Sequence, residues 1–256
     1  MNKKPLYASM PFLSAAAGLI IWEILGRIEI SPLFPSFTEI LTAWLAVLSE
    51  AETYRNIALS LITLIYGFGA AVLIGIPLGL LMGYYQKIDQ ALGVIINAVQ
   101  GAPMAAFVPV LMVLYGTGPL VQISVVFLFA FFVICIGAES GAKGVDKNLA
   151  EMARSFGANG WTIFRRIVLP SSARYIFSGL YMGIIRSIQG LVTAEMLVTL
   201  KGIGAEVMYY GQAFLTDYLF ATILNILILA VILGRIVRFA GDCVLKKMNQ
   251  GGVFNA

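Results

Sequence analysis

Residues 57–84 read IALSLITLIYGFGAAVLIGIPLGLLMGY and contain no charged side chain. A helix needs about 20 predominantly apolar residues to cross the hydrocarbon core of a bilayer, which is about 30 Å thick. A stretch of this length and composition therefore predicts a membrane-spanning helix. Similar apolar stretches recur along the chain, which predicts an all-α membrane protein.

Six spans are predicted from this pattern. They are Tyr7–Leu25, Ile57–Tyr84, Leu92–Tyr115, Leu120–Ala138, Ala173–Leu200 and Leu219–Phe239. The first span follows Lys3 and Lys4 and resembles the apolar core of a signal peptide. We interpret it as a retained span, because its apolar character continues to Trp22 without a clear cleavage site.

The composition of the chain excludes several classes of protein. Of its 256 residues 60% are hydrophobic and 12% are charged, about half the usual charged share, so a water-soluble fold is excluded. Histidine is absent, which excludes His metal ligands and nucleophiles that depend on a histidine base. Cys135 and Cys243 have no CxxC spacing, and we interpret both as unreactive. No cofactor is expected on this chain.

Basic residues are unevenly distributed between the predicted loops. With the N-terminus in the cytoplasm, the inner segments hold all basic residues except Arg27, Arg55 and Lys201 outside and Arg186 within a span. Lys and Arg concentrate in cytoplasmic loops of membrane proteins. Both termini are therefore predicted to be cytoplasmic, and the net charge of +4 does not indicate nucleic-acid binding.

The first outer loop contains a short amphipathic helix. Ser36-Phe-Thr-Glu39 has the spacing of a capping box, and apolar residues follow at helical intervals up to Leu48. This helix is too short to span a bilayer. It either lies in the outer membrane interface or packs against the other helices as a lid.

Small residues and prolines mark the second and third spans. Gly67, Ala71, Gly75, Gly79 and Gly83 stand four apart, a pattern that favours close packing against another membrane helix. In the same span Pro77 predicts a bend, and Pro103 and Pro109 predict an irregular third span.

The longest polar segment is the inner loop from Glu139 to Ser172. We expect a helix over residues 148–156 that ends at Gly157 in a left-handed conformation. A second short helix is expected over residues 161–168, with Pro170 preventing its continuation. The two helices would form a cytoplasmic projection suited to a groove on a partner. Its aromatic anchors would be Phe156, Trp161 and Phe164, surrounded by Arg154, Arg165 and Arg166.

This loop resembles the signature of the permease subunits of ABC importers, which runs EAA, three residues, Gly, nine residues, I-x-L-P. The matching residues are Glu151, Ala153, Gly157, Ile167, Leu169 and Pro170, whereas Met152 replaces the usual second alanine. Pro35-Ser36, Gly75–Gly79, Ala102-Pro103, Tyr115–Gly118 and Lys201–Gly204 are similar to the nitrate, sulfonate and taurine subgroup. Related permeases also carry pyrimidine precursors of thiamine.

The resemblance implies a type I importer fold, with residues 1–256 forming one permease domain of the cell inner membrane. It further implies that the loop couples transport to a separate ATPase, through the signature residues and Arg165. Because the chain lacks a G-x-x-x-x-G-K-[ST] loop, ATP and Mg would bind to that partner. The expected assembly has two permease copies, two ATPase subunits and an extracytoplasmic solute-binding protein.

Two charges within the fifth span are candidates for the substrate pathway. A charge at the centre of a membrane costs about 2.5–3.5 kcal/mol and usually faces protein or water. Arg186 and Glu195 are nine residues apart, which places them on opposed faces about 13 Å apart along the axis. Gln189 is a third candidate, and Thr193 and Gln122 offer further polar contacts. A structural role for either charge remains an equal alternative.

The expected function is import of a small polar or anionic solute. One alternative is a secondary transporter or channel that works without an ATPase, but neither an inverted repeat nor a coupling-ion site is evident in the sequence. A second alternative is a membrane enzyme. The scattered acidic residues and the lack of histidine argue against it.

Overall fold

The structure is a computed structural model that describes residues 4–28, 31, 33–198 and 201–250. Every regular element in these ranges is helical. The elements are α1 (Lys4–Arg27), α2 (Phe37–Ser49), α3 (Ala51–Tyr84), α4 (Gln86–Gln100), η1 (Met104–Ala106), α5 (Phe107–Tyr115), α6 (Pro119–Lys143), α7 (Lys147–Ser155), α8 (Gly160–Ile163), η2 (Phe164–Val168), α9 (Leu169–Val198), α10 (Ile203–Gln212) and α11 (Thr216–Gln250). The all-α prediction is confirmed.

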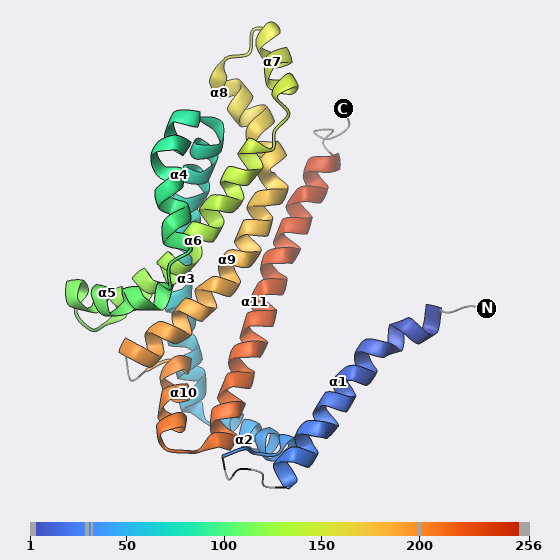
Figure 1. Ribbon diagram of the computed structural model, residues 1–256, viewed down its shortest axis with the longest axis vertical. Coiled ribbons are helices and arrows are strands. Elements are labelled where there is room, and N and C mark those ends of the chain that lie inside the picture. The colour runs from blue at the N-terminus through green and yellow to red at the C-terminus, as the bar shows by residue number, and fades with distance from the viewer. Residues whose placement is uncertain (1–3, 29–30, 32, 199–200, 251–256) are drawn as a thin grey trace.

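The core of the molecule is the bundle of α3, α6 and α9, with α11 along its side (Figure 1). The small-residue stripe of α3 lies against α6, as predicted. A Cβ atom added at Gly75 would lie 3.3 Å from the Phe131 carbonyl oxygen, and one at Gly79 would collide with the carbonyl oxygen of Cys135. Without a hydrophobic drive between helices in lipid, such backbone contact supplies the packing energy.

The interface between α6 and α9 also depends on glycine. An added Cβ at Gly137 would lie 2.9 Å from the Cα atom of Gly179. The two helix backbones therefore touch at this crossing. As a result α6 lies between α3 and α9 and supplies buried side chains to both contacts.

The predicted spans are reproduced in part. Among the described residues, four helices are long and apolar enough to cross a membrane: α3, α6, the continuous helix Gly160–Val198 and α11. The predicted first span, Tyr7–Leu25, falls within α1. The side chains of the first part of this helix, up to residue 12, lie outside the described part of the chain. Pro77 lies inside α3, which continues as one helix to Tyr84.

The predicted third span, Leu92–Tyr115, is not one continuous helix. It consists of α4 and the η1–α5 segment, which are bent by 90° relative to each other. The break lies at residues 101–103, because Gly101 ends α4 and Pro103 lacks the N–H that would continue the helix. Pro109 lies near the start of α5, where a helix tolerates proline.

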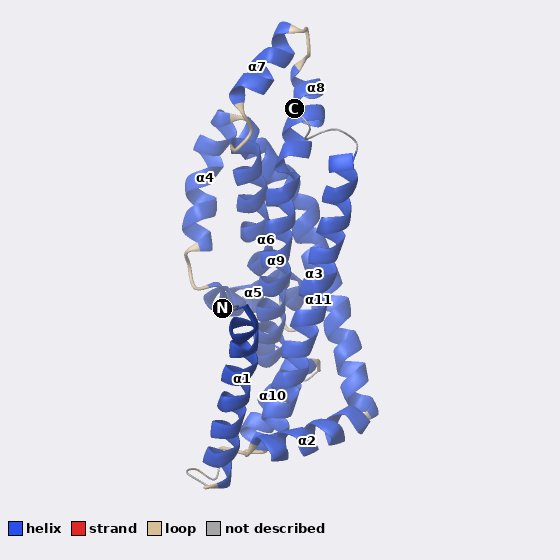
Figure 2. Ribbon diagram, turned by 90° about the vertical axis from the view of Figure 1, so that its right-hand side faces the viewer, coloured by secondary structure: helices blue, strands red, loops and turns tan. Residues whose placement is uncertain are grey.

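One end of the bundle carries the α7–α8 projection, and the opposite end carries α2 and α10 (Figures 1 and 2). The C-terminal end of α11 lies on the side of the projection (Figure 1). Thus the predicted cytoplasmic loop and the predicted outer helix are at opposite ends of the molecule.

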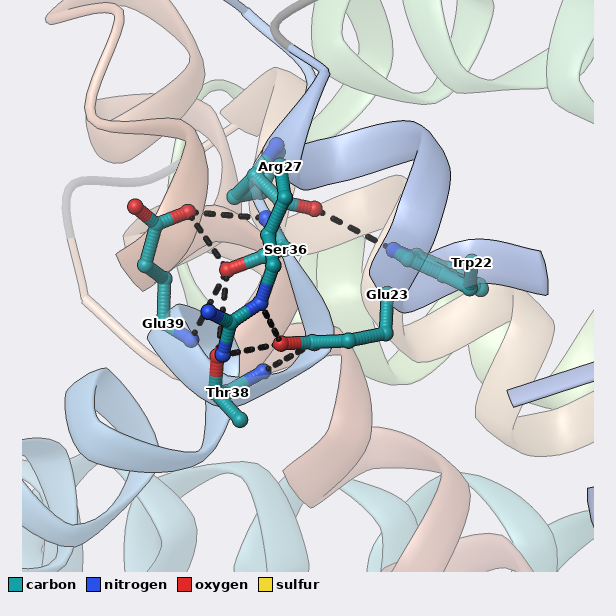
Figure 3. Close-up of polar contacts among 7 residues, drawn as sticks. Trp22, Glu23, Arg27, Ser36, Thr38 and Glu39 are labelled. Carbon is teal, nitrogen blue, oxygen red and sulfur yellow. Dashed lines mark hydrogen bonds and ion pairs between the residues drawn. The ribbon is translucent and has the colours of Figure 1, made fainter. Parts of the chain in front are cut away.

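The corner between α1 and α2 is held by polar contacts (Figure 3). The predicted capping box forms, because Glu39 N–H bonds to Ser36 Oγ and Ser36 N–H bonds to Glu39 Oε2 at 2.8 Å. Glu23 of α1 accepts hydrogen bonds from the N–H and the hydroxyl of Thr38, at 3.0 and 2.9 Å. Glu23 therefore connects α1 to the first turn of α2 by two hydrogen bonds.

Helix α2 packs on α11 through a buried face of Ile40, Ala43 and Val47. Its Trp44 donates a hydrogen bond of 2.7 Å to Asn225 Oδ1 of α11. Of the two alternatives for this amphipathic helix, these contacts support packing against the other helices.

Candidate functional site

The projection begins with α7 and a tight turn. Asp146 caps α7 by accepting a bond of 2.9 Å from the N–H of Asn148. At its other end Gly157 has φ +80°, the left-handed conformation predicted for it. The N–H groups of Gly157 and Ala158 bond to the carbonyls of Arg154 and Ala153, which is the Schellman pattern of helix termination. The turn therefore favours glycine because of its left-handed backbone conformation.

The second half of the projection corrects one prediction. Pro170 does not end a short helix, because α8, η2 and α9 form one helix from Gly160 to Val198. The residues before Pro170 form a π turn, in which the N–H of Leu169 bonds to the carbonyl of Phe164 five residues earlier. The missing N–H of proline thus falls where the α-helical ladder is already interrupted.

The three predicted aromatic anchors are placed differently. The exposed fractions of Phe156 and Trp161 are 86% and 68%, so both are available to a partner. Phe164 is half-buried and packs against Tyr84 of α3, with ring centroids 5.7 Å apart. Below it Ile163 is fully buried in the cluster that joins the projection to α3, α6 and α9. The projection is therefore firmly attached at its base.

Some signature residues are half-buried at the base of the projection and others are exposed. Ala153 and Ile167 are half-buried against the cluster at the base, whereas Glu151, Arg165 and Leu169 are exposed. Pro170 is half-buried at the start of α9.

An ion-pair network lies beside the projection. Lys143 Nζ of α6 is 2.7 Å from Asp89 Oδ2 of α4 and 2.6 Å from Glu139 Oε1 of α6. Asp89 and Lys143 also line a cavity of about 500 Å³ that extends to Glu151 of α7. This network links α4 to the last turns of α6, from which the chain leads into the projection, and was not recognised in the sequence.

The pathway candidates of α9 lie in two different environments. Arg186 is exposed and donates a hydrogen bond of 3.2 Å to the exposed Gln189. Arg186 and Thr193 line a cavity of about 360 Å³ between α6, α9 and the break of α4 and α5. Within the described ranges no carboxylate forms an ion pair with Arg186.

Glu195 is almost completely buried, with an exposed fraction of 1%. Its carboxylate accepts hydrogen bonds from Ser60 Oγ of α3 at 2.6 Å and from the N–H of Gly204 in α10 at 2.8 Å. A Cβ atom at Gly202 would collide with this carboxylate. Glu195 therefore joins α3, α9 and the start of α10.

Two residues of α3 complete this polar cluster. The Asn56 side chain donates to Glu206 Oε1 at 2.7 Å and accepts from the N–H of Gly202 at 3.1 Å. Ser60 Oγ accepts from the N–H of Ile203 at 3.0 Å. Sequence reasoning missed Asn56 and Ser60, although two polar residues four apart on an apolar helix were a usable signal. Gln122 is also buried, and its Oε1 lies 3.4 Å from Thr63 Oγ1.

The chain is similar in sequence to known membrane transport proteins. Residues 75–249 match the family model described as "Binding-protein-dependent transport system inner membrane component". A protein of Methanocaldococcus jannaschii named as an ABC transporter permease is 31% identical over 89% of this chain and 87% of its own length. The taurine transport system permease protein TauC of Escherichia coli is 29% identical over 84% of this chain and 81% of its own length.

Other relatives are named as permeases for aliphatic sulfonates, nitrate and formylaminopyrimidine. Among solved structures, an inward-facing conformation of the MetNI methionine ABC transporter matches with a TM-score of 0.59. It is 22% identical, and the match covers 77% of this chain and 94% of that chain. These findings confirm the family resemblance and the type I importer permease fold.

Proposed function

The chain belongs to the family of binding-protein-dependent transport system inner membrane components, and from this premise we propose how it works within an importer. It acts as the membrane-spanning subunit that carries a small polar or anionic solute inward. Two copies form the pathway, each beside one separate ATPase subunit, and an extracytoplasmic binding protein delivers the solute. Both termini face the cytoplasm, on the side of the ATPase.

The observation that carries this proposal is the continuity of the projection with α9. One helix runs from Gly160, beside the exposed Trp161, to Val198. A helix transmits displacement along its axis because each residue is hydrogen-bonded to the next turn. Movement of the projection by the ATPase is therefore delivered to the segment that contains Arg186.

The signature residues have separate roles in this mechanism. Ala153 and Ile167 seat the projection on the bundle, and Gly157 makes its turn. Glu151, Arg165 and Leu169 are exposed and contact the ATPase. Pro170 is the second residue of α9, just after the π turn. Phe156 and Trp161 supply the buried aromatic contacts that dominate the energy of many interfaces.

Hydrolysis of ATP takes place on the partner. The sequence lacks a phosphate-binding loop, and the relatives are named as permeases. The chain is thus a transport subunit, with ATP and Mg bound to the ATPase.

The test is to purify the tagged chain from its native membrane in mild detergent and to identify the co-purifying proteins by mass spectrometry. A stoichiometric ATPase is expected with the wild type, and the double variant Phe156→Ala/Trp161→Ala is expected to lose it. Tyr209→Ala is the matched control, because Tyr209 is an exposed aromatic residue of α10, and α10 lies at the opposite end of the bundle (Figure 1). Solute uptake by the chain alone would instead establish the alternative, a secondary transporter or channel.

A further inference from the structure

The cavity beside Arg186 combines one positive charge with apolar walls. We propose that this cavity binds a small organic anion, whose acidic group pairs with the Arg186 guanidinium and whose apolar part contacts α6 and the break of α4 and α5. The proposal rests on the proposed transport function and specifies the class of solute that passes this point.

Arg186 brings a positive charge to the cavity. An arginine within a membrane helix is costly unless it faces water or protein, and the exposed Arg186 faces this cavity. A guanidinium has five N–H donors, of which one bonds to Gln189. In the described part of the chain no carboxylate neutralises it. The remaining donors suit an oxyanion, which guanidinium groups bind through paired hydrogen bonds.

The walls of the cavity are mostly apolar. Beside Arg186, Gln100 and Thr193, the lining is apolar and includes Phe129, Phe132 and Met104. Such walls favour a ligand that has an apolar body as well as an acidic group. A volume of about 360 Å³ is at the small end of the range for ligand sites.

Phe129 places the apolar wall close to the charge of Arg186. A Cβ atom at Gly190 would lie 2.8 Å from Phe129 Cγ, so the ring rests directly on the backbone of α9. Gly190 follows Arg186 by four residues, which places it one turn away on the same side of the helix. The aromatic wall thus begins one turn from the charge.

The test measures protection of a cysteine by ligands. The purified complex carries Thr193→Cys in a background with Cys243→Ser, because Cys243 is exposed whereas Cys135 is buried. Labelling by N-ethylmaleimide is timed without ligand and with propanesulfonate, its neutral isostere propanesulfonamide, or nitrate. Gln100→Cys is the second reporter if Thr193→Cys does not fold.

Propanesulfonate is expected to slow labelling at least threefold, propanesulfonamide to have no effect and nitrate to need a several-fold higher concentration. Arg186→Gln should abolish the protection and Arg186→Lys should retain part of it, whereas Arg174→Gln, an exposed arginine of α9 outside the cavity, should leave it unchanged.

Equal protection by the neutral isostere, protection that persists in Arg186→Gln, or no labelling at either reporter would overturn the proposal. Protection by nitrate at the same concentration as propanesulfonate would overturn its organic part. This readout requires no ATP hydrolysis or transport. Its failure is therefore distinct from failure of the importer function, which the recovery of an ATPase tests.

Discussion

Arg186 and Glu195 are opposite charges in the second half of one membrane helix, and the fold places them in opposite environments. Glu195 is buried and accepts hydrogen bonds from α3 and α10. Arg186 is exposed, with one hydrogen bond to a neighbour on its own helix. The difference indicates that a charge in a membrane helix is structural when the protein satisfies it and available for a ligand when the protein leaves donors free.

The largest effect is expected from removing the buried charge. Glu195→Leu leaves Ser60 Oγ–H and the N–H of Gly204 without an acceptor, and each unsatisfied buried group costs about 1–3 kcal/mol. The melting temperature of the purified protein should fall by at least roughly 4 °C. Arg186→Leu, the matched change of the exposed charge, should leave it nearly unchanged. Equal melting temperatures for the two variants would contradict the comparison.

A smaller loss of stability is expected from Gly202→Ala. Gly202 has φ +101°, and its added Cβ atom would collide with the Glu195 carboxylate. Backbone strain alone costs of order 1–3 kcal/mol, and displacement of the carboxylate adds to it. Melting of Gly202→Ala alone and combined with Glu195→Leu separates the two contributions. If the steric account is right, the combined loss is less than the sum of the single losses.

Gly157→Ala should have a still smaller effect on stability. Gly157 has φ +80°, but its Cβ position faces open space with no heavy atom within 4 Å. Only backbone strain of about 1–2 kcal/mol is expected. Gly157→Asn should restore most of this loss, because asparagine tolerates the left-handed conformation. Thermal melting of the two variants provides the measurement, and identical losses would argue against a backbone cause.

The smallest expected effect on stability is its dependence on pH through Glu206. The carboxyl group of Glu206 is less buried than that of Glu195, and it accepts a hydrogen bond from Asn56. Burial raises the pKa of Glu206, although the Asn56 hydrogen bond opposes this shift. A raised folded-state pKa stabilises the protein below the ordinary glutamate pKa of about 4.3. That stabilisation is lost as pH rises through the folded-state value.

The check on Glu206 is to measure melting temperatures of wild type and Glu206→Gln across pH. The Gln variant should gain in relative stability as pH rises, because it carries no ionisable group at this position. If the melting temperature of Glu206→Gln minus that of wild type stays constant or falls as pH rises, burial of Glu206 does not determine the pH dependence of stability.

Sequence spacing predicted that Arg186 and Glu195 lie on opposed faces of one helix, because helical periodicity is local. It did not predict which of the two is buried. That outcome depends on Asn56 and Ser60 of α3, which lie far from α9 in the chain. It also depends on the packing of the start of α10 against Glu195, which the spacing within one helix does not specify. The cavity that Arg186 lines likewise depends on the break between α4 and α5, because residues of that break form part of its wall.

The three prolines affect their helices differently, and this too depends on neighbouring residues. Pro103 marks a true break between α4 and α5, and Pro77 lies within an uninterrupted helix. Pro170 was predicted to end a helix but follows a π turn. The effect of a proline depends on whether neighbouring residues can take over its missing hydrogen bond, and that property cannot be seen from one residue.

The π turn at Phe164–Val168 sets the angular phase between the projection and the membrane helix. One extra residue in a turn rotates everything before it by about 100° relative to a regular α-helix. The π turn therefore sets the direction in which Trp161 points relative to the direction in which Arg186 points. Deleting one residue within this turn would leave both side chains in place on the helix but would rotate Trp161 relative to Arg186. A partner bound at Trp161 would then lie at a different angle to the segment that contains Arg186.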